Sequence, residues 1–530
     1  MNVIWNKTLE PILKISWSLR QGLVTFLSRR ATQLALLVAF VVGAALLLVI
    51  GLPLALLLAT VFVVIFALTW VVQLLVGAWR FVQLHVLRGE PDPNPFNVAN
   101  PTPFPTLEPS IGGFDLVRTV GPYNPDGFYD GVFEGGGVKA IAQIGALRRM
   151  EEFGMRPQRL VGTSGGAIAA AGIAVGGTSA DLWNVLARAD LTALFDARNL
   201  PNARSWRRPF YGITPLMVPL VQRWGLMKGD AFLTFMRSGL RSIDGPFEGL
   251  GRDITFGDID AEWRKRLKEQ GLPDPAANAH RLTVLATDVT RGRPLRLPDD
   301  ISQYCLNPGG LCATCRAGGD CVTAATLDVA RAVRMSMSIP FLFEPYRLRL
   351  KLVEEGDGER TVTDGGLCHI VDGGVSSNFP IWILDTTPGT APRYPTFGFL
   401  LDEDKGVDGR PLAEKVKPVR WLGGLAMAII GAGIGVIDRV PSKHNARRTV
   451  SIPTLGVGTA DFELTAKTQV ALHESGVRAA DRFFTGADGY EPFDWAEYVR
   501  SYRGGKARPV YPGTELNRTE QHKQVEYVKF

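Results

Sequence analysis

The sequence predicts an α/β fold, a three-layer domain with a central sheet flanked by helices, preceded by a transmembrane helical hairpin. Between residues 127 and 486, short runs rich in β-branched residues alternate with helical stretches, an order that builds a sheet covered by helices. Two of the strand-to-helix transitions pass through glycine-rich turns. The apolar excess of the chain is concentrated in residues 34–79.

The composition excludes several classes of protein. With 46% hydrophobic and 21% charged residues, the chain is too apolar to be disordered. Its 58 Gly and 35 Pro among 530 residues stay below the share typical of low-complexity chains, roughly 25–30%. A net charge of +6 suits anionic membrane surfaces and nucleic acids alike, but no nucleic-acid-binding motif accompanies it. We therefore expect a lipid bilayer as partner and no nucleic acid; protein partners remain open.

The first elements are a basic N-terminal segment, residues 1–33, and a long apolar run. Residues 31–79 contain no Asp, Glu, Lys or Arg, and about 20 apolar residues suffice to cross a bilayer once. Gly51-Leu52-Pro53 divides this run, so residues 34–79 are expected to form a transmembrane hairpin. A single tilted span and a buried helical pair are the alternatives. A cleaved signal peptide is a poor match, because the apolar run starts late and is much longer than a signal core.

Positive charges flank the apolar run on both sides. Arg29 and Arg30 precede it, and Arg80 and Arg88 follow it. Because cytoplasmic flanks carry the excess of Lys and Arg, both ends are expected on the cytoplasmic side. This predicts an integral protein of the plasma (inner) membrane whose remaining chain faces the cytoplasm.

Residues 80–126 are expected to form a juxtamembrane, proline-rich linker. Seven prolines lie between residues 91 and 109 and stiffen the chain toward polyproline II. Toward the other end, residues 421–437 form an apolar stretch interrupted by five glycines. This stretch is compatible with a helix at the bilayer surface, with a third membrane span or with plain core packing. Residues 487–530 are expected to form a polar C-terminal tail.

The domain at residues 127–486 begins with a strand, a glycine turn and a helix. The expected strand at residues 129–134 leads into Gly135, Gly136 and Gly137, and an apolar helical pattern follows from Ile141. Consecutive glycines at a helix start let backbone N–H groups bind an anion or an oxyanion. The spacing fits neither a P-loop nor a dinucleotide-binding turn, and a tight structural turn would explain it equally well.

The second unit places a serine in the same kind of turn. Residues 162–166, Gly-Thr-Ser-Gly-Gly, satisfy G-x-S-x-G and lie between a short strand and a helix of small residues. Flanking glycines permit the sharp turn that presents a nucleophilic serine, here Ser164. A serine that caps a helix is the alternative.

A nucleophilic serine needs a base. None of the six histidines lies in a recognisable motif, although His473 remains an alternative base. Asp372, in Asp-Gly-Gly, follows an apolar strand and is a better candidate. A second Asp-Gly-Gly begins at Asp364, which follows a polar turn and is expected in a surface hairpin.

Together these pieces resemble, in order and spacing, the patatin-like phospholipase family. The resemblance rests on residues 134–139, 162–166 and 372–374, and further similar stretches lie at 256–258, 283–288 and 334–341. It spans about residues 129–484. Ala140 stands where the family usually has glycine, and Gly165 stands where alanine is commoner.

The resemblance implies a serine acyl hydrolase that needs no cofactor for catalysis. Ser164 would be the nucleophile, Asp372 the base, and the N–H groups of Gly135, Gly136 and Gly137 the oxyanion hole. Lys139 would neutralise a lipid phosphate, unless it is simply a solvated lysine. With the hairpin, this predicts a membrane-anchored lipid acyl hydrolase of the phospholipase A or lysophospholipase type that acts on membrane lipids. An inactive, lipid-binding membrane scaffold is the alternative function.

Four of the five cysteines crowd into the insertion at residues 304–322. Thiolates at such spacing can close a tetrahedral structural zinc site, although only one Cys-x-x-Cys pair is present. Reduced thiols in an ordinary loop and disulfides are the alternatives. The residues concerned are Cys305, Cys312, Cys315 and Cys321.

Overall fold

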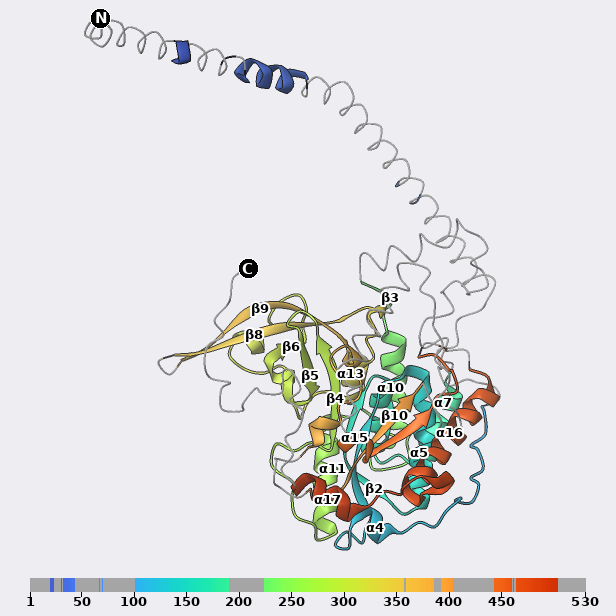
Figure 1. The fold of residues 1–530 in the computed structure, drawn as a ribbon. Helices are drawn as coiled ribbons and strands as arrows, with labels where there is room; N and C mark the ends of the chain where they lie inside the picture. The colour runs from blue at the N-terminus through green and yellow to red at the C-terminus, as the bar shows by residue number, and fades with distance from the viewer. Residues whose placement is uncertain are drawn as a thin grey trace, which may run out of the picture. The chain divides into compact units, whose positions relative to one another are not determined.

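The structure is a computed structural model of the chain, drawn in Figure 1. It describes residues 101–189, 224–356, 359–385, 392–403, 443–459, 461 and 464–503, and the short pieces 20–22, 30, 32–42, 66 and 69. The chain divides into two units, Met1–Pro91 and Asp92–Phe530, and the expected linker at residues 80–126 crosses this division.

In the first unit, residues 32–42 are helical and carry exposed apolar side chains such as Leu36 and Phe40. Among the described residues, no helix combines the length and the apolar character that crossing a membrane requires. Most of the predicted hairpin, residues 34–79, and the whole of the apolar stretch 421–437 lie outside the described residues.

The second unit is built on a mixed sheet with the order β11-β10-β1-β2-β4-β9-β8-β6, with β5 paired to β4 as well. The parallel strands are β1 (Phe128–Phe133), β2 (Arg156–Thr163), β4 (Leu282–Asp288), β10 (Thr396–Asp402) and β11 (Thr449–Pro453). The antiparallel additions are β5 (Arg293–Leu297), β6 (Tyr304–Cys305), β8 (Tyr346–Gly356) and β9 (Glu359–Asp372). A separate parallel pair joins β3 (Gly225–Met227) to β7 (Phe341–Phe343).

Helices flank this sheet, as the sequence predicted (Figure 1). The α-helices are α4 (Leu116–Val120), α5 (Ile141–Glu152), α6 (Gly165–Ala174), α7 (Ser179–Arg188), α10 (Asp230–Arg241), α11 (Phe256–Glu269), α12 (Ala313–Arg316), α13 (Val329–Ser336), α15 (Lys443–Ala446), α16 (Ala466–Thr485) and α17 (Trp495–Arg503). Short 3₁₀ turns are η4 (Gly137–Ala140), η7 (Asp299–Gln303), η8 (Gly373–Val375), η9 (Ile381–Leu384) and η10 (Ala487–Gly489).

Both faces of the sheet are buried at its central strands. Along β1, Phe133 enters the main hydrophobic core, whereas its neighbour Val132 enters a smaller core with Val161 and Ile381. Successive side chains of a strand point to opposite faces, so the two cores lie on the two sides of the sheet. This explains why β1 and β4 are buried at every position rather than at alternate ones.

Helices α5 and α16 pack backbone against backbone, side by side (Figure 1). A Cβ atom on Gly145 would overlap the carbonyl group of His473, and one on Gly476 would overlap the carbonyl oxygen of Ala142. Only glycine permits this close approach. The contact fixes α5, and with it the glycine turn that precedes this helix.

The described domain reaches beyond the boundaries that the sequence suggested. Phe493 and Tyr498 are buried in the main core, so residues 487–503 are part of the domain rather than of a polar tail. At the other end, the indole N–H of Trp183 donates to the carbonyl of Thr102, and Phe104 packs against the Trp183 ring. In both segments a few aromatic side chains within a polar stretch provide the attachment.

Candidate active site

Ser164 occupies a strained turn between β2 and α6. Its backbone has φ 51° and ψ −125°, a conformation that non-glycine residues rarely adopt. The backbone N–H of Ser164 donates to Ser336 Oγ at 2.8 Å, and Ser336 Oγ donates in turn to the Leu285 carbonyl at 2.5 Å. Ser336 therefore holds the turn in place. This is the strand-to-helix geometry that the sequence predicted for a nucleophilic serine.

The register of three neighbouring strands brings Asp372 to Ser164. Thr163 at the end of β2 pairs with Leu285 of β4, and the next residue of β4, Ala286, pairs with Asp372 of β9. Ser164 Oγ donates a hydrogen bond to Asp372 Oδ2 at 2.6 Å and also lies 3.4 Å from Met337 Sδ. Both residues of the pair are buried.

The other Asp-Gly-Gly lies elsewhere, as expected. Asp364 belongs to the long hairpin of β8 and β9 (Figure 1), where it pairs with Lys351. Its carboxylate lies 3.4 Å from Arg349 Nε and accepts the N–H of Gly366 at 2.9 Å. Of the two candidate aspartates, only Asp372 contacts Ser164 within the described residues.

The environment of Asp372 raises the pKa of its carboxyl to about 6. Burial is the main cause, because an ionised carboxylate loses its hydration there. Hydrogen bonds from the Ser164 hydroxyl and from the Gly374 N–H, the latter at 2.8 Å, act in the opposite direction. A carboxylate with this pKa can accept and return a proton near neutral pH.

The three glycines at residues 135–137 are not equivalent. The N–H of Gly135 donates to the carbonyl of Asn378 at 3.0 Å, so it is already in use. In the part of the chain that the structure describes, the N–H groups of Gly136 and Gly137 have no protein acceptor. Only these two of the three predicted donors are left available for an oxyanion.

The glycine turn touches the serine turn directly. A Cβ atom on Gly165 would lie 2.6 Å from the carbonyl oxygen and 2.7 Å from the nitrogen of Gly137. This accounts for glycine where the family more often has alanine: here the two turns are in backbone contact. The free N–H groups therefore lie beside the nucleophile turn.

Asn378 and Glu134 connect the turn of Asp372 to the glycine turn. Asn378 Nδ2 donates to the Gly135 carbonyl at 2.9 Å and to Glu134 Oε1 at 3.0 Å. The other carboxylate oxygen of Glu134 accepts the N–H of Leu401 at 2.5 Å. Neither residue has a role predicted from the sequence, although Glu134 begins the stretch 134–139. Their position was the available signal, since Glu134 directly precedes Gly135 and Asn378 follows Asp372 by six residues.

Lys139 is neither solvated nor free for a headgroup. Its side chain is buried, and its Nζ lies 2.7 Å from Glu403 Oε1. The positive charge is therefore already paired within the domain. A role in neutralising a lipid phosphate would require this ion pair to open.

His473 does not contact Ser164. It lies on α16 between the rings of Phe104 and Trp183, at 5.4 Å from each ring centroid. Burial, with a further contribution from the nearby Arg148, lowers the pKa of His473 to about 4. The conventional triad with His473 as base, one of the alternatives from the sequence, is thus not assembled in this structure.

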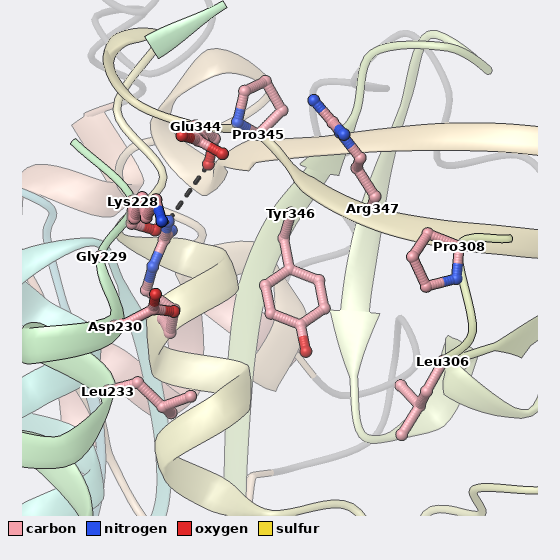
Figure 2. Close-up of a pocket in the computed structure, with 11 residues that line it drawn as sticks. Lys228, Gly229, Asp230, Leu233, Leu306, Pro308, Glu344, Pro345, Tyr346 and Arg347 are labelled. Carbon is pink, nitrogen blue, oxygen red and sulfur yellow. Dashed lines mark hydrogen bonds between the residues drawn. The ribbon is translucent and has the colours of Figure 1, made fainter. Parts of the chain in front are cut away.

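A pocket of about 240 Å³ is lined in part by Arg334 of α13 and is lined by neither Ser164 nor Asp372 (Figure 2). Arg334 connects this pocket to the Ser164 site. It donates to the Glu344 carbonyl in the pocket wall and to Ser338 Oγ. The carbonyl of Ser338 accepts the N–H of Asp372 at 2.8 Å. The lining residues are Lys228, Gly229, Asp230, Leu233, Leu306, Pro308, Arg334, Glu344, Pro345, Tyr346 and Arg347.

The four clustered cysteines do come together. The sulfur atoms of Cys305, Cys312, Cys315 and Cys321 all lie within 4.8 Å of one another. They lie at the β6 edge of the sheet and take no part in the Ser164 site. These residues could hold a metal ion.

Comparisons with known proteins give sequence matches over most of this domain. Residues 131–385 match the patatin-like phospholipase family. The chain is 32% identical over 370 residues to the uncharacterized protein YqhO of Bacillus subtilis (strain 168). This match covers 67% of this chain and 98% of YqhO.

Solved structures with a detectable likeness include two bacterial proteins. ExoU, in its complex with SpcU from the type III secretion system of Pseudomonas aeruginosa, is 17% identical with a TM-score of 0.31, covering 67% of this chain and 52% of ExoU. VipD from Legionella pneumophila is 15% identical with a TM-score of 0.31, covering 71% of this chain and 67% of VipD. The match thus spans about half the length of ExoU. On its sequence matches, the chain belongs to the patatin-like phospholipase family.

Proposed function

We propose that the protein is a lipid acyl hydrolase of the phospholipase A or lysophospholipase type that works through a Ser-Asp dyad. The observation that carries the proposal is the 2.6 Å hydrogen bond from Ser164 Oγ to Asp372 Oδ2, in a strained turn beside free backbone N–H groups. A nucleophile, a base within hydrogen-bonding reach and an oxyanion site are what acyl transfer requires.

In the first half of the reaction, Ser164 Oγ attacks the carbonyl carbon of a fatty-acyl ester while its proton passes to Asp372. The tetrahedral oxyanion accepts hydrogen bonds from the N–H groups of Gly136 and Gly137, each worth on the order of 3 kcal/mol in the transition state. Collapse breaks the ester bond, and the leaving alcohol takes the proton from Asp372. The acyl group remains on Ser164.

In the second half, Asp372 accepts a proton from water as the water attacks the acyl-enzyme. The tetrahedral intermediate then collapses, Ser164 Oγ takes that proton back from Asp372, and the fatty acid is released. The raised pKa of Asp372 suits both steps, since a base that has accepted a proton must also return it.

Membrane anchoring is the second part of the proposal. The support is the absence of charge in residues 31–79 and the exposure of Leu36 and Phe40, which are 70% and 74% exposed. An inner-membrane anchor with the domain on the cytoplasmic side would give the site a substrate that diffuses in the same membrane. Fractionation, with protease protection of tagged ends, tests this part separately.

The proposed activity is tested on a mixed lipid extract. Purified full-length protein should release free fatty acids and lyso-lipids, identified by mass spectrometry, and a fluorophosphonate probe should label Ser164. Ser164→Ala and Asp372→Asn should lose both products, whereas Asp364→Asn, the matched change in the other Asp-Gly-Gly, should keep them. A folded wild-type protein that neither releases fatty acid nor reacts with the probe would favour the inactive lipid-binding scaffold.

A further inference from the structure

The cysteine cluster lies where an irregular insertion joins the sheet. Cys305 ends β6, Cys312 immediately precedes α12, Cys315 lies within this helix, and Cys321 follows it. Three separate points of the insertion are thus drawn to the edge strand. The thiols are not joined as disulfides, and two of them, Cys305 and Cys315, are fully buried.

The spacing of the sulfur atoms fits one small cation. Four thiolates around tetrahedral Zn²⁺, each with a Zn–S bond of about 2.3 Å, lie about 3.8 Å from one another. All four sulfur atoms of the cluster lie within 4.8 Å of one another, so only a small contraction separates them from this geometry. Chance proximity explains one pair of thiols readily, but it does not explain four that converge mutually.

We propose that Cys305, Cys312, Cys315 and Cys321 bind one structural Zn²⁺ ion. Soft thiolate ligands in a tetrahedral set select zinc or iron rather than magnesium or calcium. Because all four positions come from the protein, the site has no open coordination position for a substrate or a water molecule. The role is structural, and it is separate from the Ser164 chemistry.

The surroundings suit bound thiolates. The N–H of Cys312 donates to Cys305 Sγ at 3.4 Å, a contact that spreads the negative charge of a sulfur ligand. Buried Lys351 forms an ion pair with Asp320, the residue next to Cys321, and so fixes this end of the insertion to β8. The cluster offers little apolar cover of its own, chiefly Leu311 and Val362. A metal ion would therefore supply the stability that a hydrophobic core supplies elsewhere.

The zinc site also supports one wall of the pocket in Figure 2. Leu306, the residue after Cys305, and Pro308 both line that pocket. Zinc removal should loosen this wall and make residues 306–322 more sensitive to proteolysis. Cleavage in the rest of the domain should not change.

The test is metal analysis of full-length protein purified under reducing conditions without chelators. We expect one zinc per chain in the wild type. Cys312→Ser and Cys321→Ser should lower the zinc content at least about fivefold, because a lost thiolate removes one of four bonds. Cys368→Ser is the matched control, since Cys368 is also buried but lies outside the cluster.

A second readout uses the folded wild-type protein alone, in case the variants fail to fold. Titration with a mercurial reagent should release one zinc as four thiols react, and Co²⁺ exchanged into the protein should show the absorption of tetrahedral cobalt thiolate. Wild-type protein that is metal-free with four independently reactive thiols, that contains disulfides, or that holds iron would overturn the proposal. None of these readouts depends on lipid hydrolysis, so the two proposals fail separately.

Discussion

At the scale of single residues, the site depends on a carboxyl group whose pKa is raised toward neutral pH by burial. Asp372 receives hydrogen bonds from Ser164 and Gly374, yet burial outweighs both and raises its pKa to about 6. An aspartate with its ordinary pKa near 4 would be a weaker base. The pKa shift makes proton transfer from serine less unfavourable without a histidine.

This gives a prediction for the pH dependence of hydrolysis. Only the ionised form of Asp372 can accept the proton of Ser164, so kcat/KM should fall about tenfold per pH unit below pH 6 and level off above it. Initial rates with a short-chain ester between pH 4.5 and 8.5 measure the profile. A profile that stays flat down to pH 4.5 would contradict the role of Asp372 as base.

Residues that look alike in the sequence differ through contacts that only the fold creates. Gly135, Gly136 and Gly137 were equivalent candidates, and the carbonyl of Asn378, more than 200 positions away, removes one of them. Likewise, the sequence around His473 does not show whether this residue is a catalytic base or a buried aromatic ring. The choice of Asp372 over Asp364 could be made in advance, because apolar and polar neighbours distinguish a core strand from a surface hairpin.

At the scale of elements, strand-turn-helix units were the predictable part of the fold. Glycine turns between an apolar strand and a helix mark both β1 to α5 and β2 to α6. The stretch at residues 256–258 turns out to be a helix start: Thr255 and Asp258 form a capping box on α11. The burial of α17 could not be predicted in this way, because its few aromatic residues find partners only in the folded domain.

The packing of α5 on α16 gives a second prediction. In an isolated helix, Gly145→Ala would gain up to about 1 kcal/mol from helix propensity. Here the new methyl group would overlap the carbonyl of His473, which is backbone and cannot rotate away. We expect the overlap to win and to lower the free energy of unfolding by about 2 kcal/mol or more.

Chemical denaturation of purified variants measures this effect. Gly251→Ala is the control, because a Cβ atom there meets no other atom within 4 Å, and its effect should stay within about 0.5 kcal/mol. Equal stability of the two variants would show that α5 and α16 are free to separate. Because α5 follows the glycine turn, Gly145→Ala should also reduce ester hydrolysis.

At the scale of the whole molecule, the site contains features that lower the stability of the folded protein. Ser164 holds a strained backbone conformation, and Asp372 buries a carboxylate at neutral pH. Such features persist only because the surrounding sheet and helices fix them. Substitutions that relieve them are expected to stabilise the protein and to abolish its activity.

Asp372→Asn tests this trade-off through its pH dependence. The pKa of Asp372 is raised in the folded protein from 3.8 to about 6, so the folded state binds the proton more tightly than the unfolded state does. As pH rises from about 4 to 6, this preference is lost, and above pH 6 the buried charge costs about 3 kcal/mol. The amide carries no charge, so Asp372→Asn should exceed the wild type in unfolding free energy at pH 8, and the difference should shrink toward pH 4. Denaturation at both pH values measures it, with Asp364→Asn as the control that should show no such trend. A variant that is destabilised equally at both pH values would mean that the ionised carboxylate holds the site together instead of straining it.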